Sequence, residues 1–342
     1  MATTWAVPPT GASGGVGFVD FTFTRCALNP APMAWVIFVA PDDLGEAILA
    51  TGALAHVVGG ADELTILGNA EFNALLRSAP AAKLCFPSER PLAFAALLRV
   101  QGHRCDTLID ARGDLGARLL PARRRYGVGG EPILQHRIEA WGAALGAERA
   151  LLPAIWLDAG ARSASAAIAP DAAPLLLLAP GGNAEAKRWP HDRFAAVARR
   201  LATGPLEHPR IVVLSAAPRD AEIAARIVSS LDADGVAAAD LGAGADLLAA
   251  AALAERATLC IGNDNALTHI AAAMGAPTLT LFGPTDERVR APRGPRARTL
   301  RGKSFEAIAV MPALDARAVM DEISIDAVEA AALDLLHAGG LR

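Results

Sequence analysis

Val36-Ile-Phe-Val-Ala-Pro41 and Leu175-Leu-Leu-Leu-Ala-Pro180 are the two stretches that decide the fold. Each is a short, wholly apolar run that ends in Ala-Pro and is followed by a polar loop and an amphipathic stretch. A run that is apolar at every position is typical of a strand buried on both faces of a parallel sheet. Because the pattern occurs twice, the sequence predicts two similar α/β domains in tandem.

Short apolar runs alternate with longer amphipathic stretches on either side of these two. This alternation predicts strands over Trp35–Val39, Leu64–Leu67, Lys83–Phe86, Thr107–Ile109, Leu175–Leu178, Ile211–Leu214, Thr258–Ile261 and Thr278–Phe282. The last amphipathic stretch, Ile323–His337, predicts a helix that packs back across a domain surface. Ligands of open α/β sheets bind beyond the carboxyl ends of the strands, so we expect the loops 41–46 and 180–188 to face one ligand.

Two segments do not follow this alternation of strand-like and helix-like stretches. Residues 1–32 mix Gly, Pro, Ser and Thr without a period, which predicts a disordered extension and makes Met33 a candidate initiator. Residues 159–173 are rich in Ala, Ser, Asp and Pro, as in an interdomain linker. The predicted domains therefore cover residues 33–158 and 174–342.

Composition limits the class of protein. With 342 residues, 53% of them hydrophobic and 20% charged, the chain can fold into two ordinary domains. A net charge of -4 argues against general nucleic-acid binding. We find neither a signal-peptide pattern nor an apolar run of the roughly 18 residues that cross a bilayer. The four cysteines form no C-x-x-C pair. We therefore expect a reduced, cytoplasmic protein without a cysteine-bound metal.

The loop Pro180-Gly-Gly-Asn-Ala-Glu-Ala-Lys-Arg-Trp-Pro190 is the first candidate binding segment. Its glycines, Gly181 and Gly182, allow a ligand to approach the backbone closely. Lys187 is one of only three lysines in a chain that otherwise uses arginine, which favours a role for a compact ammonium group. A solvated loop lysine is the plainer alternative.

The stretch Cys260-Ile-Gly-Asn-Asp-Asn-Ala-Leu-Thr-His269 is the second candidate. A buried strand is followed by a polar turn that caps a helix of small residues. The free amides of such a helix start can bind phosphate, and the helix dipole favours this. Alternatively, Asp264 or Asn265 is simply an N-cap, and His269 is a core histidine that donates to a carbonyl.

In order and spacing, these segments resemble the heptosyltransferases of glycosyltransferase family 9. The resemblance rests on Ala179–Pro190, Leu241–Leu253, Gly262–His269, Ala273–Pro277 and Leu281–Thr285, and in the first half on Leu44–Leu54 and Asp106–Gly113. It extends from about Met33 to the C-terminus.

The resemblance implies a GT-B fold, in which two Rossmann-like domains face a central cleft and the second binds a nucleotide sugar. It also implies the inverting transfer of a heptose from ADP-heptose to the lipopolysaccharide inner core, with no metal and no cofactor. Asp232-Ala-Asp234 is accordingly read as a solvated turn. Lys187 and the helix start near Asn265 would offset the charge that grows on the ADP leaving group.

An inverting transfer needs a base that takes the proton of the acceptor hydroxyl. The family has an Asp in its opening loop, and the matching position here is Glu46, which is one methylene longer. Asp42 and Asp43 are rival candidates. A first-turn acid that only interacts with the helix dipole is the plainer reading of Glu46.

Donor contacts also follow from the resemblance. The family's Asp-Thr-Gly is Asp264-Asn265-Ala266 here, and Ala266 adds a methyl group where glycine lets phosphate approach the backbone. His269 would help to hold the diphosphate, and Asp264 would order the loop. An acid after the strand Ile211–Leu214 would hold the nucleoside, and Asp220 and Glu222 are the two alternatives for it. The remaining donor candidates are Gly181, Gly182, Asn183 and Lys187.

Local basic stretches in this acidic chain suggest where an acceptor could bind. The candidate acceptor residues are Asp43, Arg112, Arg123 and Arg124, and a second basic stretch contains Arg288, Arg290, Arg293, Arg296, Arg298 and Arg301. They could meet a lipid-anchored anionic glycan at the inner membrane surface, where the protein would be peripheral. A solvated face is the default alternative.

Two other functions stay open. The differences from the family's residues at Glu46 and Ala266 fit a nucleotide-sugar-binding protein with weakened catalysis. A GT-B glycosyltransferase that uses another donor, such as a UDP-hexose, is also compatible with the motifs, because a family fixes chemistry better than it fixes the sugar.

Overall fold

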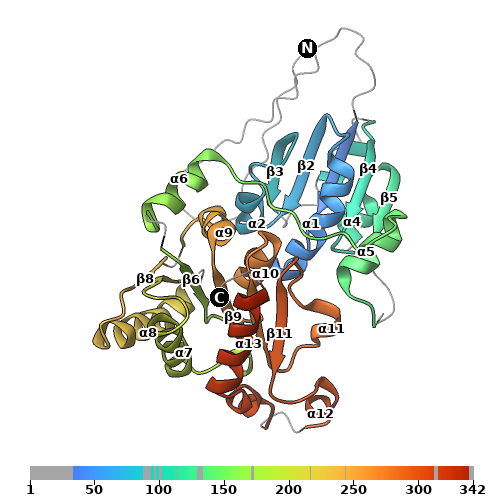
Figure 1. Ribbon diagram of the computed structural model, residues 1–342. Helices are drawn as coiled ribbons and strands as arrows, with labels where there is room; N and C mark the ends of the chain where they lie inside the picture. The colour runs from blue at the N-terminus through green and yellow to red at the C-terminus, as the bar shows by residue number, and fades with distance from the viewer. Residues whose placement is uncertain are drawn as a thin grey trace, which may run out of the picture. The chain divides into compact units, whose positions relative to one another are not determined.

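Two parallel β-sheets organise the chain in a computed structural model (Figure 1). The structure describes residues 34–87, 94–95, 98–99, 102–113, 115–128, 134–170, 173–215, 217–242, 244–311 and 315–338. The first sheet contains β1 (Trp35–Val39), β2 (Glu63–Gly68), β3 (Ala82–Pro87), β4 (Cys105–Asp110) and β5 (Ala122–Gly127), in the order β3-β2-β1-β4-β5. The predicted extension 1–32 lies outside the described residues.

The second sheet repeats this order and adds one strand. It contains β6 (Leu175–Ala179), β7 (Arg210–Val213), β8 (Ala238–Asp240), β9 (Leu259–Asn263), β10 (Thr278–Phe282) and β11 (Ala297–Arg301), in the order β11-β10-β9-β6-β7-β8. The strand order reverses between β1 and β4 in the first sheet and between β6 and β9 in the second. Loops diverge at such switch points and leave room for a ligand. The chain thus has the predicted α/β class, and we call the parts around the two sheets the first and second domains.

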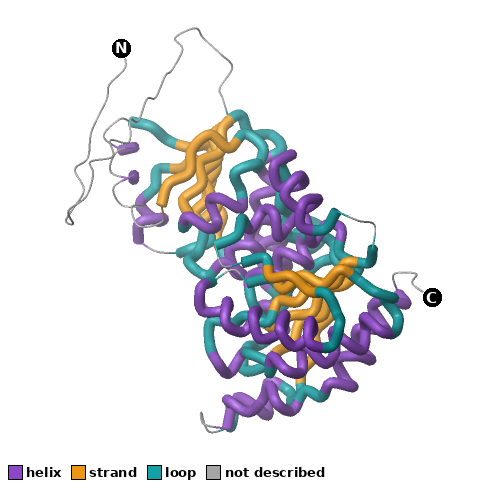
Figure 2. The backbone as a smooth tube through the Cα atoms, turned by 90° about the vertical axis from the view of Figure 1, so that its left-hand side faces the viewer, coloured by secondary structure: helices purple, strands orange, loops and turns teal. Residues whose placement is uncertain are grey.

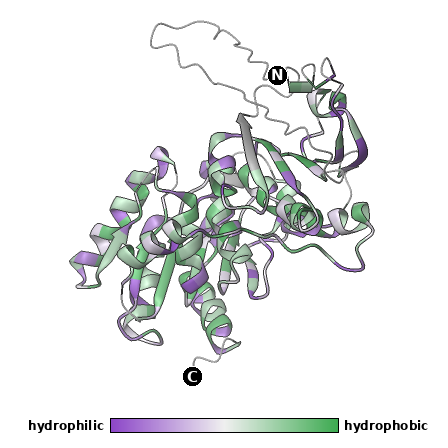
Figure 3. Ribbon diagram, turned by 90° about the horizontal axis from the view of Figure 1, so that it is seen from above, coloured by the Kyte–Doolittle hydropathy of each residue, from purple (hydrophilic) through white to green (hydrophobic). Residues whose placement is uncertain are grey.

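Helices surround both sheets (Figure 2). Those of the first half are α1 (Leu44–Val58), α2 (Ala70–Leu75), α4 (Leu115–Leu119) and α5 (Arg137–Leu145). The others are α6 (Ala159–Ile168), α7 (His191–Thr203), α8 (Ala221–Ala233), α9 (Leu247–Arg256), α10 (Ala266–Ala273), α11 (Glu287–Arg290), α12 (Phe305–Ala309) and α13 (Ile325–Ala338), with 3-10 turns η1 (Glu185–Lys187), η2 (Pro218–Asp220) and η3 (Asp315–Glu322). The helices carry both hydrophobic and hydrophilic residues (Figure 3), as expected of elements with one buried face. Within the described residues, none of them is sufficiently long and apolar to span a bilayer.

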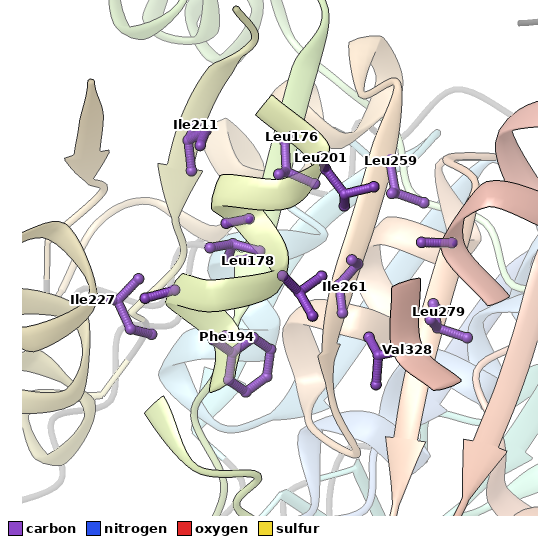
Figure 4. Close-up of a cluster of buried hydrophobic side chains, with 14 of the residues drawn as sticks. Leu176, Leu178, Phe194, Leu201, Ile211, Ile227, Leu259, Ile261, Leu279 and Val328 are labelled. Atoms are coloured by element: carbon purple, nitrogen blue, oxygen red, sulfur yellow. The ribbon is translucent and has the colours of Figure 1, made fainter. Parts of the chain in front are cut away.

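The wholly apolar runs are explained by the two-sided burial of the sheets. Along β6, Leu176 and Leu178 belong to the core cluster on one face, whereas Leu175 and Leu177 belong to the cluster on the other. Figure 4 shows the first of these clusters, in which Phe194 of α7 packs near the strand side chains. Successive strand residues point to opposite faces, so a sheet covered by helices on both sides needs apolar residues at every position.

Each strand expected from the sequence occurs, with ends within two residues of the expected bounds. The strands that the sequence did not predict, β5, β8 and β11, all lie at sheet edges. The predicted C-terminal helix occurs as α13 and packs against α7 and the strands β9 and β10 of the second sheet.

Residues 159–173, expected to form a linker, contain the helix α6. Asp158 caps this helix, because its Oδ1 accepts a hydrogen bond of 2.6 Å from the amide of Ala161. Ala161 and Ser165 are buried, and α6 packs against α9 of the second domain. Alanine is the strongest helix former, so an alanine-rich segment that follows a capping Asp folds as a helix rather than as an irregular linker.

Polar contacts join the two domains. Arg77, after α2, forms a bidentate pair with the carboxylate of Asp246, the N-cap of α9, at 2.8 and 2.7 Å. Its Nε donates to Asp158 at 2.8 Å. His136, directly before α5, is buried and lies with Nε2 at 2.9 Å from the carbonyl oxygen of Ala291, after α11. These contacts therefore hold the two domains against each other.

Candidate active site

A cavity of about 470 Å³ lies between the loops at the carboxyl ends of the two sheets. The first domain contributes residues of the loop between β1 and α1, and the second contributes the loops after β6, β7 and β9. The candidate site residues that line it are Asp43, Glu46, Gly181, Gly182, Asn183, Lys187, Asp220, Asp264, Asn265, Ala266 and His269. Its volume is within the range of small-ligand sites. The structure therefore gathers most of the predicted residues in one place.

The starts of two helices reach this cavity from opposite domains. Asp43 caps α1 by accepting the amide of Glu46 at 2.9 Å. Asn265 caps α10, because its Oδ1 accepts the amides of Leu267 and Thr268 at 2.9 and 3.2 Å. The Asn265 side chain thus acts as the N-cap, which was the structural alternative for this residue. Helix starts carry partial positive charge and favour a bound anion.

The loop after β6 takes its shape from the end of the neighbouring strand β9. The buried side chain of Asn263 donates to the carbonyl of Pro180 at 2.7 Å and accepts the amide of Trp189 at 3.1 Å. Asn265 Nδ2 donates to the carbonyls of Ala179 and Gly181, at 2.9 Å each. These bonds tie both ends of the loop to β9 and so position Lys187. Asn263 was not among the predicted site residues. The sequence signal for it is a side-chain amide at the end of an apolar strand.

Lys187, Asp264 and His269 form a charged group at the second-domain side of the cavity. Lys187 Nζ donates to Asp264 Oδ2 at 2.9 Å, and His269 Nε2 lies 3.9 Å from Asp264 Oδ1. His269 is 5% exposed, and this burial holds its pKa below the ordinary value, so its imidazole is neutral at pH 7. Lys187 therefore supplies the positive charge in this group.

Gly45 lets the start of α1 pack against this group. A Cβ added to Gly45 would lie 3.1 Å from the Cδ2 atom of His269, which is tighter than ordinary contact. The lack of a side chain at this position therefore brings the opening loop of the first domain close to His269.

Glu46 lies between two arginines that come from different domains. Arg137 Nε, on α5, is 3.1 Å from Glu46 Oε2, and Arg290 Nε, on α11, is 3.0 Å from Glu46 Oε1. Burial raises the pKa of the Glu46 carboxyl, and the two guanidinium groups oppose this rise. Arg290 lines the cavity. Sequence reasoning gave no role to Arg137, because no local pattern pairs residues so far apart in the chain.

The structure distinguishes the two acids that follow β7. Asp220 is buried and lines the cavity next to Gly181, where an added Cβ would lie 2.5 Å from Asp220 Oδ2. Glu222 is exposed on α8 and pairs with Arg226 at 2.6 Å, one helical turn away. Asp220 is therefore placed to meet a ligand, and Glu222 lies outside the cavity.

The predicted acceptor residues are brought together only in part. Asp43 lines the cavity, whereas Arg112 forms an ion pair with Asp42 and does not line it. Arg123 and Arg124 lie on the edge strand β5, and Arg123 is 3.2 Å from Asp106. Charged side chains on an edge strand discourage pairing with other chains. This role explains the basic run and requires no acceptor.

Most arginines of the second basic stretch are also engaged within the protein. Arg288 pairs with Asp286, Arg301 with Glu287 and Arg298 with Asp334. Asp234, in the turn expected to be solvated, pairs with Arg199 at 2.5 Å. In the parts of the chain that the structure describes, no three His, Cys, Asp or Glu side chains are grouped so that they could hold a metal ion.

The sequence model of glycosyltransferase family 9 (heptosyltransferase) matches residues 91–313, more than half of the chain. The chain belongs to glycosyltransferase family 9. Lipopolysaccharide heptosyltransferase 2 of Salmonella typhimurium is 31% identical over 130 residues, which are 37% of this chain and 36% of that protein. The protein of the same name from Escherichia coli K12 is 30% identical over a segment of the same size. The alignment thus spans about a third of the length of these curated relatives.

Solved structures of family 9 members share the fold. The Escherichia coli ADP-heptose lipopolysaccharide heptosyltransferase II superposes with a TM-score of 0.71 at 19% identity, over 89% of this chain and 99% of that chain. A family 9 glycosyltransferase of Veillonella parvula gives a TM-score of 0.75 at 18% identity, over 89% and 98% of the two chains. These likenesses show that the chain has the expected GT-B fold.

Proposed function

We propose that the protein is an inverting, metal-independent glycosyltransferase that transfers a heptose from ADP-heptose to a lipopolysaccharide inner-core acceptor. The observation that carries this proposal is the cavity itself, in which Lys187 and the start of α10 lie on one domain and Glu46 on the other. The names of the relatives and the family 9 fold support the sugar and the acceptor class.

The donor diphosphate would bind at Lys187 and the start of α10. The Lys187 ammonium has three N–H donors, of which one is used by Asp264, and two remain for phosphate oxygens. Together with the helix start, it would offset the charge that develops on ADP, in the place of a metal ion or another cofactor. Asp220, beside Gly181, would accept hydrogen bonds from the hydroxyl groups of the donor nucleoside.

The acceptor would enter from the side of the first domain. Its hydroxyl oxygen would bond to the anomeric carbon while the bond from that carbon to the diphosphate oxygen breaks, and its proton would pass to Glu46. Attack on the face opposite the leaving group inverts the anomeric configuration. Because the acceptor class is anchored in lipid, the protein would act as a peripheral enzyme at the cytoplasmic side of the inner membrane.

A nucleotide-sugar-binding protein with weakened catalysis is the second candidate. Two observations favour it: both Glu46 oxygens contact arginines, and Ala266 places a methyl group at the helix start where phosphate would approach. This candidate shares donor binding with the first and differs from it in turnover.

Ligand-dependent thermal stability tests the donor site. We expect ADP and ADP-heptose, but not UDP or GDP, to stabilise the wild type, by about 2.7 kcal/mol at one hundred times the dissociation constant. Lys187→Ala should lose this response. Lys303→Ala is the matched control, because Lys303 pairs with Glu322 outside the cavity. Stabilisation by UDP or GDP instead would show that the donor carries that nucleotide rather than ADP. No response to any nucleotide would contradict the proposal.

A further inference from the structure

Arg290 is the charged contact that the second domain makes with Glu46 of the first. Its Nε lies 3.0 Å from Oε1, yet this oxygen has no hydrogen-bond partner within the described residues, because the N–H group is not aligned with it. The Glu46 side chain is 15% exposed, and that of Arg290 is 48% exposed. A buried carboxylate oxygen is thus stabilised by a nearby positive charge while its lone pairs stay open to a proton.

An adjacent contact holds Arg290 in this position. Ala291, the next residue, accepts a hydrogen bond from Nε2 of His136 at 2.9 Å, and Arg137, the other partner of Glu46, directly follows His136. His136 Nδ1 accepts the amide of Ile138, so the Nε2 atom carries the proton. One hydrogen bond between the domains therefore holds both arginines near the same carboxylate.

We propose that Arg290 is a positioning residue that the donor-binding domain supplies to Glu46, so that the base is complete only while the two domains are in contact. The inference rests on the proposed function for the role of Glu46 as a base. Without Arg290, the buried Oε1 atom would lose its nearest positive charge, and only Arg137 would hold the side chain in place. Proton transfer is thereby coupled to the docking of the domain that carries the donor.

The charges around Glu46 allow this effect to be measured. Arg137 faces it from α5 and Arg290 from α11, while Asp43 is close on the α1 cap. His269 of α10, with its partner Asp264, lies beyond Gly45. Both arginines favour the ionised carboxylate, whereas Asp43 and burial favour the neutral acid. Removing Arg290 therefore shifts the balance in one direction, toward the neutral acid.

Steady-state kinetics with ADP-heptose test the proposal through Arg290→Gln and the conservative Arg290→Lys. We expect Arg290→Gln to lower kcat at pH 7 at least tenfold, to leave the KM for the donor within about twofold, and to move the acid limb of the kcat/KM profile up by about one pH unit. Arg290→Lys should recover part of kcat. Arg199→Gln, which removes a similarly exposed arginine from its pair with Asp234, should behave like the wild type.

A direct titration separates this inference from the proposed function. The ¹³C NMR signal of Glu46, in protein labelled at the glutamate carboxyl carbons and assigned by its loss in Glu46→Gln, should titrate at a higher pH in Arg290→Gln than in the wild type. This holds whether or not the wild type turns over ADP-heptose. An unchanged Glu46 titration, or an Arg290→Gln that raises only the donor KM, would overturn the proposal.

Discussion

Lys187 Nζ donates a hydrogen bond of 2.9 Å to Asp264 Oδ2, although the two residues are 77 positions apart in the chain. Lys187 follows β6 and Asp264 follows β9, so the pair spans the switch point of the second sheet. The carboxylate holds the flexible lysine at the cavity and leaves part of its ammonium group open to a ligand. We regard this pair as the basis of diphosphate binding.

A double-mutant cycle on this pair tests that interpretation. Lys187→Ala should weaken ADP binding about 10- to 100-fold, because a hydrogen bond to a charged group contributes about 1.5–3 kcal/mol. Asp264→Asn should weaken it less, and the double variant should bind no more weakly than Lys187→Ala alone. Calorimetric titration with ADP measures all four dissociation constants. Fully additive losses would show that Asp264 does not act through Lys187.

Variants of Glu46 test the identity of the base. Glu46→Gln should lower kcat by about 10²- to 10⁴-fold and leave ADP affinity unchanged, because the amide cannot take a proton. Glu46→Asp should also lower kcat, since a shorter side chain cannot keep both arginine contacts. Turnover with donor and acceptor provides the measurement. A Glu46→Asp variant that is faster than the wild type would mean that glutamate is a damaging departure at this position.

Substitution of Gly181 tests the nucleoside end of the site. The new Cβ of Gly181→Ala would lie 2.5 Å from Asp220 Oδ2 and would displace this carboxylate. We expect ADP affinity to fall about tenfold, as for the loss of a hydrogen bond to a charged group. Gly60→Ala is the control, because an added Cβ there has no heavy atom within 4 Å. Equal ADP affinities of the two variants would argue against a role for Asp220 in binding.

The burial of His136 predicts how stability depends on pH. Burial lowers the pKa of His136 to about 4, whereas an unfolded histidine titrates near 6.5. Between these values the unfolded state binds the extra proton, so stability falls as the pH falls, by about 1.4 kcal/mol per pH unit below 6.5.

Urea denaturation at pH 7.5 and pH 5 measures this dependence. His136→Gln should lose less stability between these two pH values than the wild type, because glutamine does not titrate. His337→Gln, which replaces an exposed histidine, should retain the full dependence. If His136→Gln and the wild type lose the same stability, the buried neutral state of His136 is not the cause.

The predictability of the fold follows from where each strand lies. Strands buried on both faces, such as β1 and β6, are apolar at every position and are visible in the sequence. The edge strand β5 reads Ala-Arg-Arg-Arg-Tyr-Gly and carries mostly exposed side chains, so its sequence resembles a charged surface loop. Its pairing with β4 depends on the tertiary structure, and no local sequence pattern indicates it.

The candidate site was predictable where it lies on loops that follow apolar strands. Lys187, Asp264 and Glu46 all occupy such loops or the helix start behind them, and parallel strands bring their carboxyl ends to one edge. The sequence could not distinguish between Asp220 and Glu222, because side chains two positions apart on a helix face different directions. Nor could it identify Arg137, which reaches Glu46 only through the packing of α5 on α1.

The most direct test of the proposed transfer is an assay with ADP-heptose and deacylated inner-core oligosaccharide, in which mass spectrometry detects the modified acceptor and the release of ADP is measured. We predict that the wild type adds one heptose per acceptor with inverted anomeric configuration and releases one ADP, and that Glu46→Gln and Lys187→Ala are strongly impaired. A folded wild type that binds ADP-heptose but neither modifies the acceptor nor releases ADP would contradict the proposed transfer.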